Sequence, residues 1–218
     1  MADHPLSISW LGEAALLAQT PGPMSLEVQR RVWTLERQLA PLPGVADTVL
    51  GVHSVLVMMT DDADPEALIA RLHAFWSNAT ADPRPGRLIE VPVSYGGDTG
   101  PDLGPVADHH GLSPRALAER HAAGTYTVFA LGSQPGFAYL GGLDPALATP
   151  RLDSPRLHVE AGSVVIGGAQ AGVISCSSPS GWHIIGRTET VFFDPNRAEP
   201  ALLAPGDRLR FVLQEVRP

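Results

Sequence analysis

The chain contains no lysine, because all 15 of its basic residues are arginines. This absence excludes a P-loop, in which a lysine binds the phosphates, as well as a Schiff-base lysine and a Ser–Lys hydrolase pair. Codon bias in a GC-rich genome is the simplest cause of the absence, and the chemical exclusion holds for any cause. Phosphates handled by this chain must therefore be held by arginine, backbone N–H groups, magnesium or another protein chain.

Cysteine is also scarce, with Cys176 as the single copy. An internal disulfide and a cysteine metal cluster are thereby excluded. No apolar run approaches the roughly 20 residues of a membrane-spanning helix. Residues 1–20 lack a basic segment followed by an apolar core, the pattern of a secretory signal. We therefore expect a cytoplasmic protein.

The chain is acidic, with 23 acidic residues against 15 basic ones and a formal net charge of −8. Nucleic acid is therefore not an expected partner, because phosphate backbones bind to clustered basic surfaces. A length of 218 residues with 44% hydrophobic and 17% charged residues is typical of one large or two small globular domains.

The first 80 residues repeat one pattern, two short strands followed by a helix. We expect strands at 6–11 and 14–19 and again at 45–50 and 54–59. Ser25 is positioned to cap the first helix, and Asp64-Pro65 to begin the second. This pattern predicts an α+β domain over residues 1–80, with helices on one side of an antiparallel sheet.

Residues 81–87 contain two prolines and a glycine without apolar periodicity, which predicts a linker. The second domain then covers 88–218. Asp102 and Ser113 are expected to cap two short helices. Beyond Thr125 the chain consists of short apolar runs broken by Gly, Pro and Ser, and a final strand follows Gly206-Asp207. These residues support an antiparallel barrel or sandwich.

A series of motifs fills the second domain. It begins with Gln-Pro-Gly-Phe-Ala-Tyr-Leu-Gly-Gly-Leu at 134–143. It continues with Pro150-Arg151, Pro155-Arg156, Ala161-Gly162-Ser163-Val164, Gly167-Gly168-Ala169-Gln170, Ser178-Pro179-Ser180-Gly181-Trp182, Ile185-Gly186-Arg187-Thr188 and Pro205-Gly206-Asp207. In this order the series resembles the KipI-like family, also called allophanate hydrolase subunit 1. Its best-defined members are the B subunits of bacterial ATP-dependent 5-oxoprolinase.

The resemblance extends over nearly the whole chain, and it implies a cyclophilin-like β-barrel for residues 88–218. It also implies an enzyme subunit, inactive alone, that helps to open the lactam of 5-oxoproline to glutamate with ATP. The implied partners are the KipA-like C subunit and the LamB/YcsF-like A subunit of that enzyme, and ATP with magnesium would be bound by the complex. Two alternatives stay open: a KipI-like inhibitor of a sensor histidine kinase, and a subunit related to urea carboxylase or allophanate-processing enzymes.

Arginines are the first candidates for substrate binding. Arg187 follows the small Gly186, and its guanidinium suits bidentate binding of a carboxylate or phosphate; the alternative is an ion pair at the barrel rim. Arg151 and Arg156 each follow a proline and either line an anion site or flank a surface loop. Gln170 suits an amide substrate, or else satisfies backbone groups.

Three aromatic residues, Phe137, Tyr139 and Trp182, form either the floor of a ligand groove or part of the core. No metal site is predicted, because adjacent His109 and His110 diverge on a helix. Catalytic residues cannot be named from spacing. The chain departs from the family where the usual Gln-Thr-Gly-Ile-Tyr-Pro is replaced by residues 170–175, Gln-Ala-Gly-Val-Ile-Ser.

Overall fold

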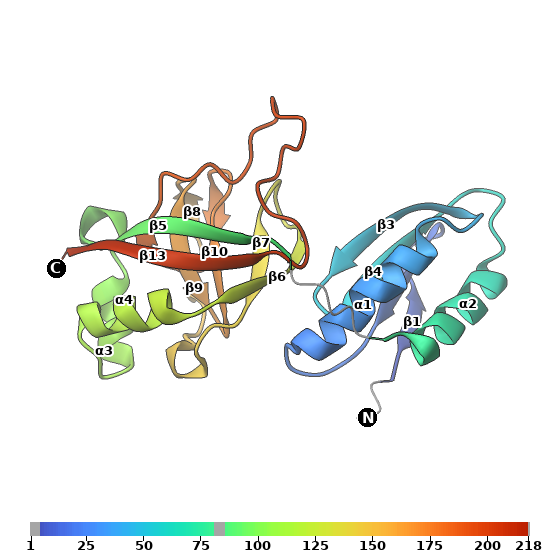
Figure 1. Cartoon of the computed structure of the whole chain (residues 1–218), viewed down its shortest axis with the longest axis horizontal. Coiled ribbons are helices and arrows are strands. Elements are labelled where there is room, and N and C mark those ends of the chain that lie inside the picture. The colour runs from blue at the N-terminus through green and yellow to red at the C-terminus, as the bar shows by residue number, and fades with distance from the viewer. Residues whose placement is uncertain (1–4, 81–85, 218) are drawn as a thin grey trace. The chain divides into compact units, whose positions relative to one another are not determined.

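A computed structural model describes residues 5–80 and 86–217 (Figure 1). The chain divides into two compact units, residues 1–84 and 85–218. Most of the predicted linker, residues 81–85, lies outside the described residues. Its last two residues make contacts within the C-terminal unit: Gly86 N donates to Gly206 O, and Arg87 is paired with Asp207.

The N-terminal unit contains the predicted repeat of two strands and a helix. Its elements are β1 (Ser7–Trp10), β2 (Ala15–Gln19), α1 (Leu26–Leu39), β3 (Val45–Gly51), β4 (Ser54–Met59) and α2 (Pro65–Asn78). The sheet has the order β1-β2-β4-β3 and is antiparallel throughout. Both predicted caps are confirmed, because Ser25 Oγ accepts from Val28 N and Asp64 Oδ1 accepts from Ala67 N.

The core of this unit lies between one face of the sheet and the two helices, which run side by side (Figure 1). Alternate strand residues point toward the helices, as the period of two in a β-strand requires. These residues pack against the apolar stripes of α1 and α2; the fully buried members include Leu16, Val55, Val57, Leu35, Leu39 and Leu72.

The C-terminal unit is a closed barrel with the strand order β10-β7-β6-β13-β5-β12-β9. The predicted fold class, an α+β domain followed by a mainly-β barrel domain, is confirmed. The elements are β5 (Leu88–Gly96), η1 (Gly97–Thr99), α3 (Leu103–His109), α4 (Pro114–Ala123), β6 (Tyr126–Leu131), β7 (Ala138–Gly141), η2 (Pro145–Leu147), β8 (Arg156–Val159), β9 (Ser163–Gly167), β10 (Gln170–Val173), β11 (Ser178–Ser180), β12 (His183–Arg187) and β13 (Arg208–Arg217).

One pairing differs from the expected antiparallel barrel, because β5 and β13 run parallel along their whole length. The reason lies where both strands begin. The carboxylate of Asp207, a buried residue, accepts hydrogen bonds from Arg87 N at 2.9 Å, from Arg87 Nη2 at 2.6 Å and from Ala204 N at 3.0 Å. The two strands therefore start side by side and continue in the same direction.

Two further layers pack on the barrel. Helices α3 and α4 contribute Leu103, Val106 and Leu117 to the barrel core. The two-stranded ribbon β8–β11 contributes Val159 to a separate apolar cluster. This cluster also contains Phe137, Trp182 and Val165 of β9. Within residues 5–80 and 86–217, no helix combines the length and apolarity that crossing a membrane would require.

A buried histidine lies between α4 and the barrel core. His121 is completely buried, its Nδ1 is 2.8 Å from Tyr95 Oη, and its ring stacks on Phe211 with centroids 4.6 Å apart. Burial lowers the pKa of His121 from 6.5 to about 3, because an imidazolium in this position would lose its hydration. The folded chain therefore keeps this ring neutral at physiological pH.

This burial predicts a loss of stability in acid. Below pH 6.5 the unfolded chain protonates His121, whereas the folded chain does so only near a pKa of about 3. Stability is therefore complete above pH 6.5 and falls as the pH drops toward 3. At about pH 5 this group should lower the free energy of unfolding by about 2 kcal/mol relative to about pH 7.5, as measured by urea unfolding.

The substitution His121→Phe keeps an aromatic ring against Phe211 and should remove this part of the pH dependence. The matched control is His158→Gln, since His158 is exposed on the ribbon of the same unit. An unchanged pH slope in His121→Phe would contradict the assignment.

Candidate functional site

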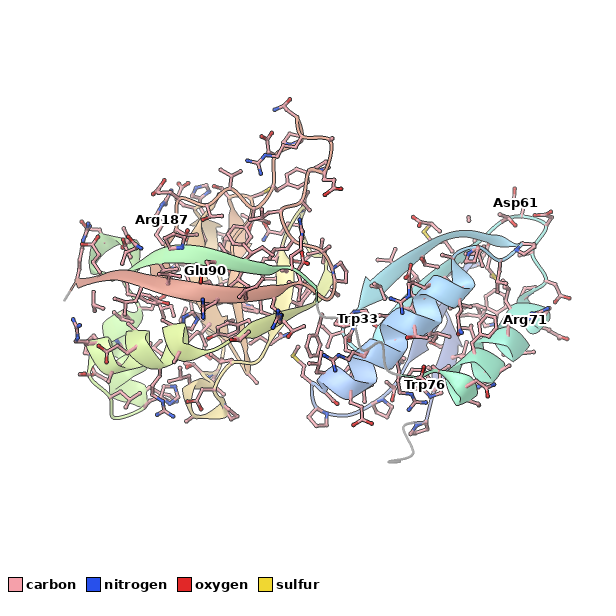
Figure 2. The ribbon with its side chains drawn as sticks, in the orientation of Figure 1. Trp33, Asp61, Arg71, Trp76, Glu90 and Arg187 are labelled. Carbon is pink, nitrogen blue, oxygen red and sulfur yellow. The ribbon has the colours of Figure 1, made fainter. Side chains whose placement is uncertain are left out.

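A hollow surrounds Arg187, at the end of β12. It has a volume of about 740 Å³ and is formed by the ends of β12, β5 and β13 together with η1. Figure 2 shows Arg187 on the outer side of the barrel, close to β5. Besides Arg187, the hollow is lined by Pro92, Ser94, Thr99, Thr188, Glu189, Thr190, Gln214, Glu215 and Arg217. Hydroxyl, amide, carboxylate and guanidinium groups therefore converge on one space.

The backbone around Arg187 is fixed by a close approach to Gly162. Thr188 N donates to Gly162 O at 2.9 Å. Gly162 has a φ of +86°, and a Cβ on this residue would lie 2.4 Å from Thr188 O. Only glycine fits both conditions. The two motifs Ala-Gly-Ser-Val and Ile-Gly-Arg-Thr thus depend on each other, and their contact determines where the Arg187 side chain leaves the barrel.

The Arg187 guanidinium is only weakly neutralised. Its ion pair with Glu189 has a nitrogen–oxygen distance of 3.8 Å, and the Glu189 side chain is 95% exposed. Such an exposed pair contributes little energy and is easily exchanged for another anion. The second arginine in the hollow, Arg217, is closer to its partner, at 2.6 Å from Glu215. Arg187 is therefore the guanidinium in this hollow with most capacity to bind a ligand anion.

Arg156 has a structural partner. Its two terminal nitrogens donate to the two carboxylate oxygens of Asp102 at 2.8 and 2.7 Å. The same carboxylate accepts from Ile184 N at 2.7 Å. Asp102 was expected to cap α3, but its side chain makes no capping hydrogen bond. The expectation was wrong because the carboxylate instead links α3, β12 and the β8–β11 ribbon, and this link occupies the fork of Arg156.

The three aromatic candidates lie together, largely inside a cluster. The Phe137 ring meets those of Tyr139 and Trp182 edge-on, with centroids 5.3 and 5.8 Å apart. Phe137 is 5% and Trp182 8% exposed. Trp182 lies directly over Gly167, where a Cβ would be 2.4 Å from the indole. The structure thus places Phe137 and Trp182 in a core rather than in an open groove.

The remaining candidates lie apart from Arg187. The Arg151 guanidinium lies over the Trp182 ring, 5.4 Å from its centroid. Gln170 begins β10 opposite Gly167 and lines neither the Arg187 hollow nor the one beside Arg151. His183, which lines the hollow beside Arg151, begins β12, whereas Arg187 ends it. Because strands rise about 3.3 Å per residue, these two ends are roughly 13 Å apart. Substrate binding by these residues stays a prediction.

Residues that line the Arg187 hollow also include some that the sequence analysis did not select. Ser94 and Pro92 alternate along β5 with the buried Val91, Val93 and Tyr95. This period of two identifies their outward face, but nothing in the sequence shows that β12 and β13 flank it. The departures from the family pattern lie elsewhere: Ala171, Val173 and Ile174 are buried, so they alter packing rather than the lining of this hollow.

The comparisons with known proteins agree with this architecture. The sequence profile of the family described as "Carboxyltransferase domain, subdomain C and D" matches residues 6–203. The chain belongs to this family. It is 44% identical over 209 residues to the B subunit of 5-oxoprolinase from Escherichia coli O157:H7, covering 94% of each chain. It is 40% identical over 211 residues to the B subunit of 5-oxoprolinase from Haemophilus influenzae, covering 97% of this chain and 99% of that one.

A solved protein of similar fold is TTHA0988. Its crystal structure superposes with a TM-score of 0.78 at 34% identity over 94% of this chain. The present chain spans only 41% of the TTHA0988 chain. A chain segment of this fold thus also occurs as part of a longer polypeptide.

The Asp102–Arg156 link makes a testable prediction about stability. Replacing Asp102 with Asn removes a carboxylate whose side chain is only 12% exposed and leaves Arg156 without its anionic partner. We expect the free energy of unfolding to fall by about 2 kcal/mol in urea. The control Glu119→Gln breaks the exposed Arg115–Glu119 pair and should cost less than about 0.5 kcal/mol. Equal, small losses in both variants would show that the buried pair is not a structural link.

Proposed function

We propose that this chain is the B subunit of an ATP-dependent 5-oxoprolinase, acting with a KipA-like C subunit and a LamB/YcsF-like A subunit. One observation carries the proposal. Two relatives named as B subunits of 5-oxoprolinase are 44% and 40% identical to it, and both matches cover at least 94% of both chains. Both matches extend over the N-terminal and the C-terminal unit. The cytoplasmic location expected from the sequence stays a prediction.

The proposed reaction needs a site for the substrate carboxylate and a site for ATP. The substrate 5-oxoproline is a five-membered lactam that carries a carboxylate. Its amide bond is stable, so bound ATP would supply activation of the carbonyl oxygen before water adds and the C–N bond breaks. Because this chain has no lysine, its own part in binding either anion rests on arginine and neutral donors. The ATP and magnesium sites are proposed at the level of the complex.

We assign Arg187 to the carboxylate of the substrate. The hollow around it, about 740 Å³, is large enough for a small ring, and Ser94, Thr190 and Gln214 offer neutral hydrogen-bond partners on its walls. The planar fork of arginine binds a carboxylate through two parallel hydrogen bonds. In this role Arg187 orients the lactam ring.

Substitutions of Arg187 test this assignment. Arg187→Lys keeps the charge but loses the bidentate fork, so ATP-dependent cleavage of 5-oxoproline by the reconstituted complex should fall at least about tenfold in kcat/KM. Arg187→Ala should lower it further. The matched control is Arg115→Ala, because Arg115 is an exposed arginine on α4 of the same unit. Assembly, followed by size-exclusion chromatography, should be unchanged in all three variants.

One result would count against the role of Arg187, and another against the 5-oxoprolinase assignment itself. Full cleavage by both Arg187 variants would leave the 5-oxoprolinase assignment standing and make Arg187 a rim residue. No cleavage by the wild-type complex would remove the activity itself and favour a protein-binding role such as inhibition of a sensor kinase.

A further inference from the structure

A second hollow, on a different part of the barrel, is not explained by the proposed role of Arg187. It has a volume of about 350 Å³ and lies between α3 and the loop 149–153 that follows η2. Its polar lining comes from His109, Thr149, Arg151, Asp153 and His183. None of these residues lines the Arg187 hollow. The two hollows are therefore separate, and they flank opposite ends of β12.

The loop that carries Arg151 is held rigidly from both sides. Thr149 exchanges two backbone hydrogen bonds with Gly168, at 3.0 and 2.7 Å. Leu152 N donates to Gly181 O at 2.8 Å. Between them, Pro150 O accepts from His183 Nε2 at 2.8 Å. A side chain that leaves such a loop is positioned before any ligand arrives, which lowers the entropic cost of binding.

Arg151 itself is held without being neutralised. Its guanidinium lies over the Trp182 ring, and Trp182 is fixed by Gly167 and Phe137. Across the described ranges 5–80 and 86–217, Arg151 forms no ion pair with a carboxylate. Other arginines of this unit do so, including Arg87, Arg120 and Arg156. An arginine stacked on an aromatic face keeps its N–H edge available for an anion.

The charge around Arg151 is balanced rather than acidic. Two imidazoles, those of His109 and His183, line the same hollow, and Asp153 is its one acidic residue among the described residues. Asp153 makes no ion pair with Arg151 in the described structure. With neutral imidazoles, Arg151 and Asp153 balance in formal charge, whereas the whole chain has a net charge of −8. A small anion therefore meets less repulsion at this hollow than the net charge of the chain would imply.

We propose that this hollow is a second anion-binding site, in which the Arg151 fork binds the phosphate or carboxylate of a small molecule. Stacking on Trp182 holds the guanidinium in place, and its N–H edge is left for the ligand. This site does not depend on the 5-oxoprolinase proposal, because it rests only on the geometry of loop 149–153, α3 and β12.

Calorimetric titration at low ionic strength tests the proposal. The parent is the full chain carrying Arg187→Gln, so that the first hollow does not contribute. Orthophosphate and ADP are the probes for a phosphate source, and glutamate and 5-oxoproline are the probes for a carboxylate source. We expect saturable one-to-one binding of at least one probe. Adding Arg151→Gln should weaken it at least about tenfold, and Arg151→Lys should restore only part of the loss.

Two further variants separate this site from general charge effects. Arg115→Gln removes the same charge from an exposed position on α4 and should leave the dissociation constant unchanged. Asp153→Asn removes the acidic residue of the hollow and should tighten binding about threefold, the effect of one partly screened charge several ångströms away. Circular dichroism melting reports whether each variant is folded.

The outcomes are distinct. A loss in Arg151→Gln with a gain in Asp153→Asn supports the site, and the probe that binds identifies its source. No saturable binding of any probe overturns the proposal. Equal losses in Arg151→Gln and Arg115→Gln overturn it as well, because they would show non-specific attraction.

Discussion

The contact on which the barrel depends is the Asp207 carboxylate with the start of β5. Asp207 is 120 residues from Arg87 in sequence, yet its carboxylate accepts from both the backbone and the side chain of that residue. This contact brings the first and last strands of the barrel together in parallel. The hollow around Arg187 requires it, because Ser94, Arg187 and Gln214 belong to the adjacent strands β5, β12 and β13.

Four arginines of the C-terminal unit form two pairs with different surroundings. Arg87 and Arg156 each pair with a largely buried carboxylate and fix the fold at two places. Arg187 and Arg151 lie beside hollows, one with a long contact to an exposed glutamate and the other stacked on an indole. Because the chain has no lysine, arginine forms the buried pairs, and the same side-chain type is the one that we propose binds anions.

Local features of the fold could be predicted from the sequence. The caps at Ser25, Asp64 and Ser113 follow from the preference of short polar side chains for free N–H groups at a helix start, and they occur as expected. In β5 the buried Val91 and Val93 alternate with Pro92 and Ser94, as the period of two in a strand requires. The Asp102 cap was wrong because Arg156, 54 residues away, competes for the same carboxylate.

Long-range features could not be obtained in the same way. The parallel pairing of β5 with β13 joins segments about 120 residues apart, and no periodicity encodes which strands become neighbours. Arg187 was selected from its motif, but the residues around it come from three strands and η1. The resemblance supplied Arg151 and Trp182 as separate candidates. Only the folded chain shows that the guanidinium of one stacks on the ring of the other, and that Phe137 and Trp182 are buried.

Exchange of this chain for its counterpart in a related enzyme tests most directly whether it is a B subunit of 5-oxoprolinase. Glutamate formation from 5-oxoproline would be measured with the A and C subunits of the Escherichia coli enzyme and either their own B subunit or this chain, with and without ATP. If this chain is such a B subunit, we expect ATP-dependent glutamate formation with this chain and none when the B subunit is omitted. The assignment would be contradicted by two results together. This chain would give no glutamate with the Escherichia coli A and C subunits, which are active with their own B subunit, and it would give none with its own A and C subunits.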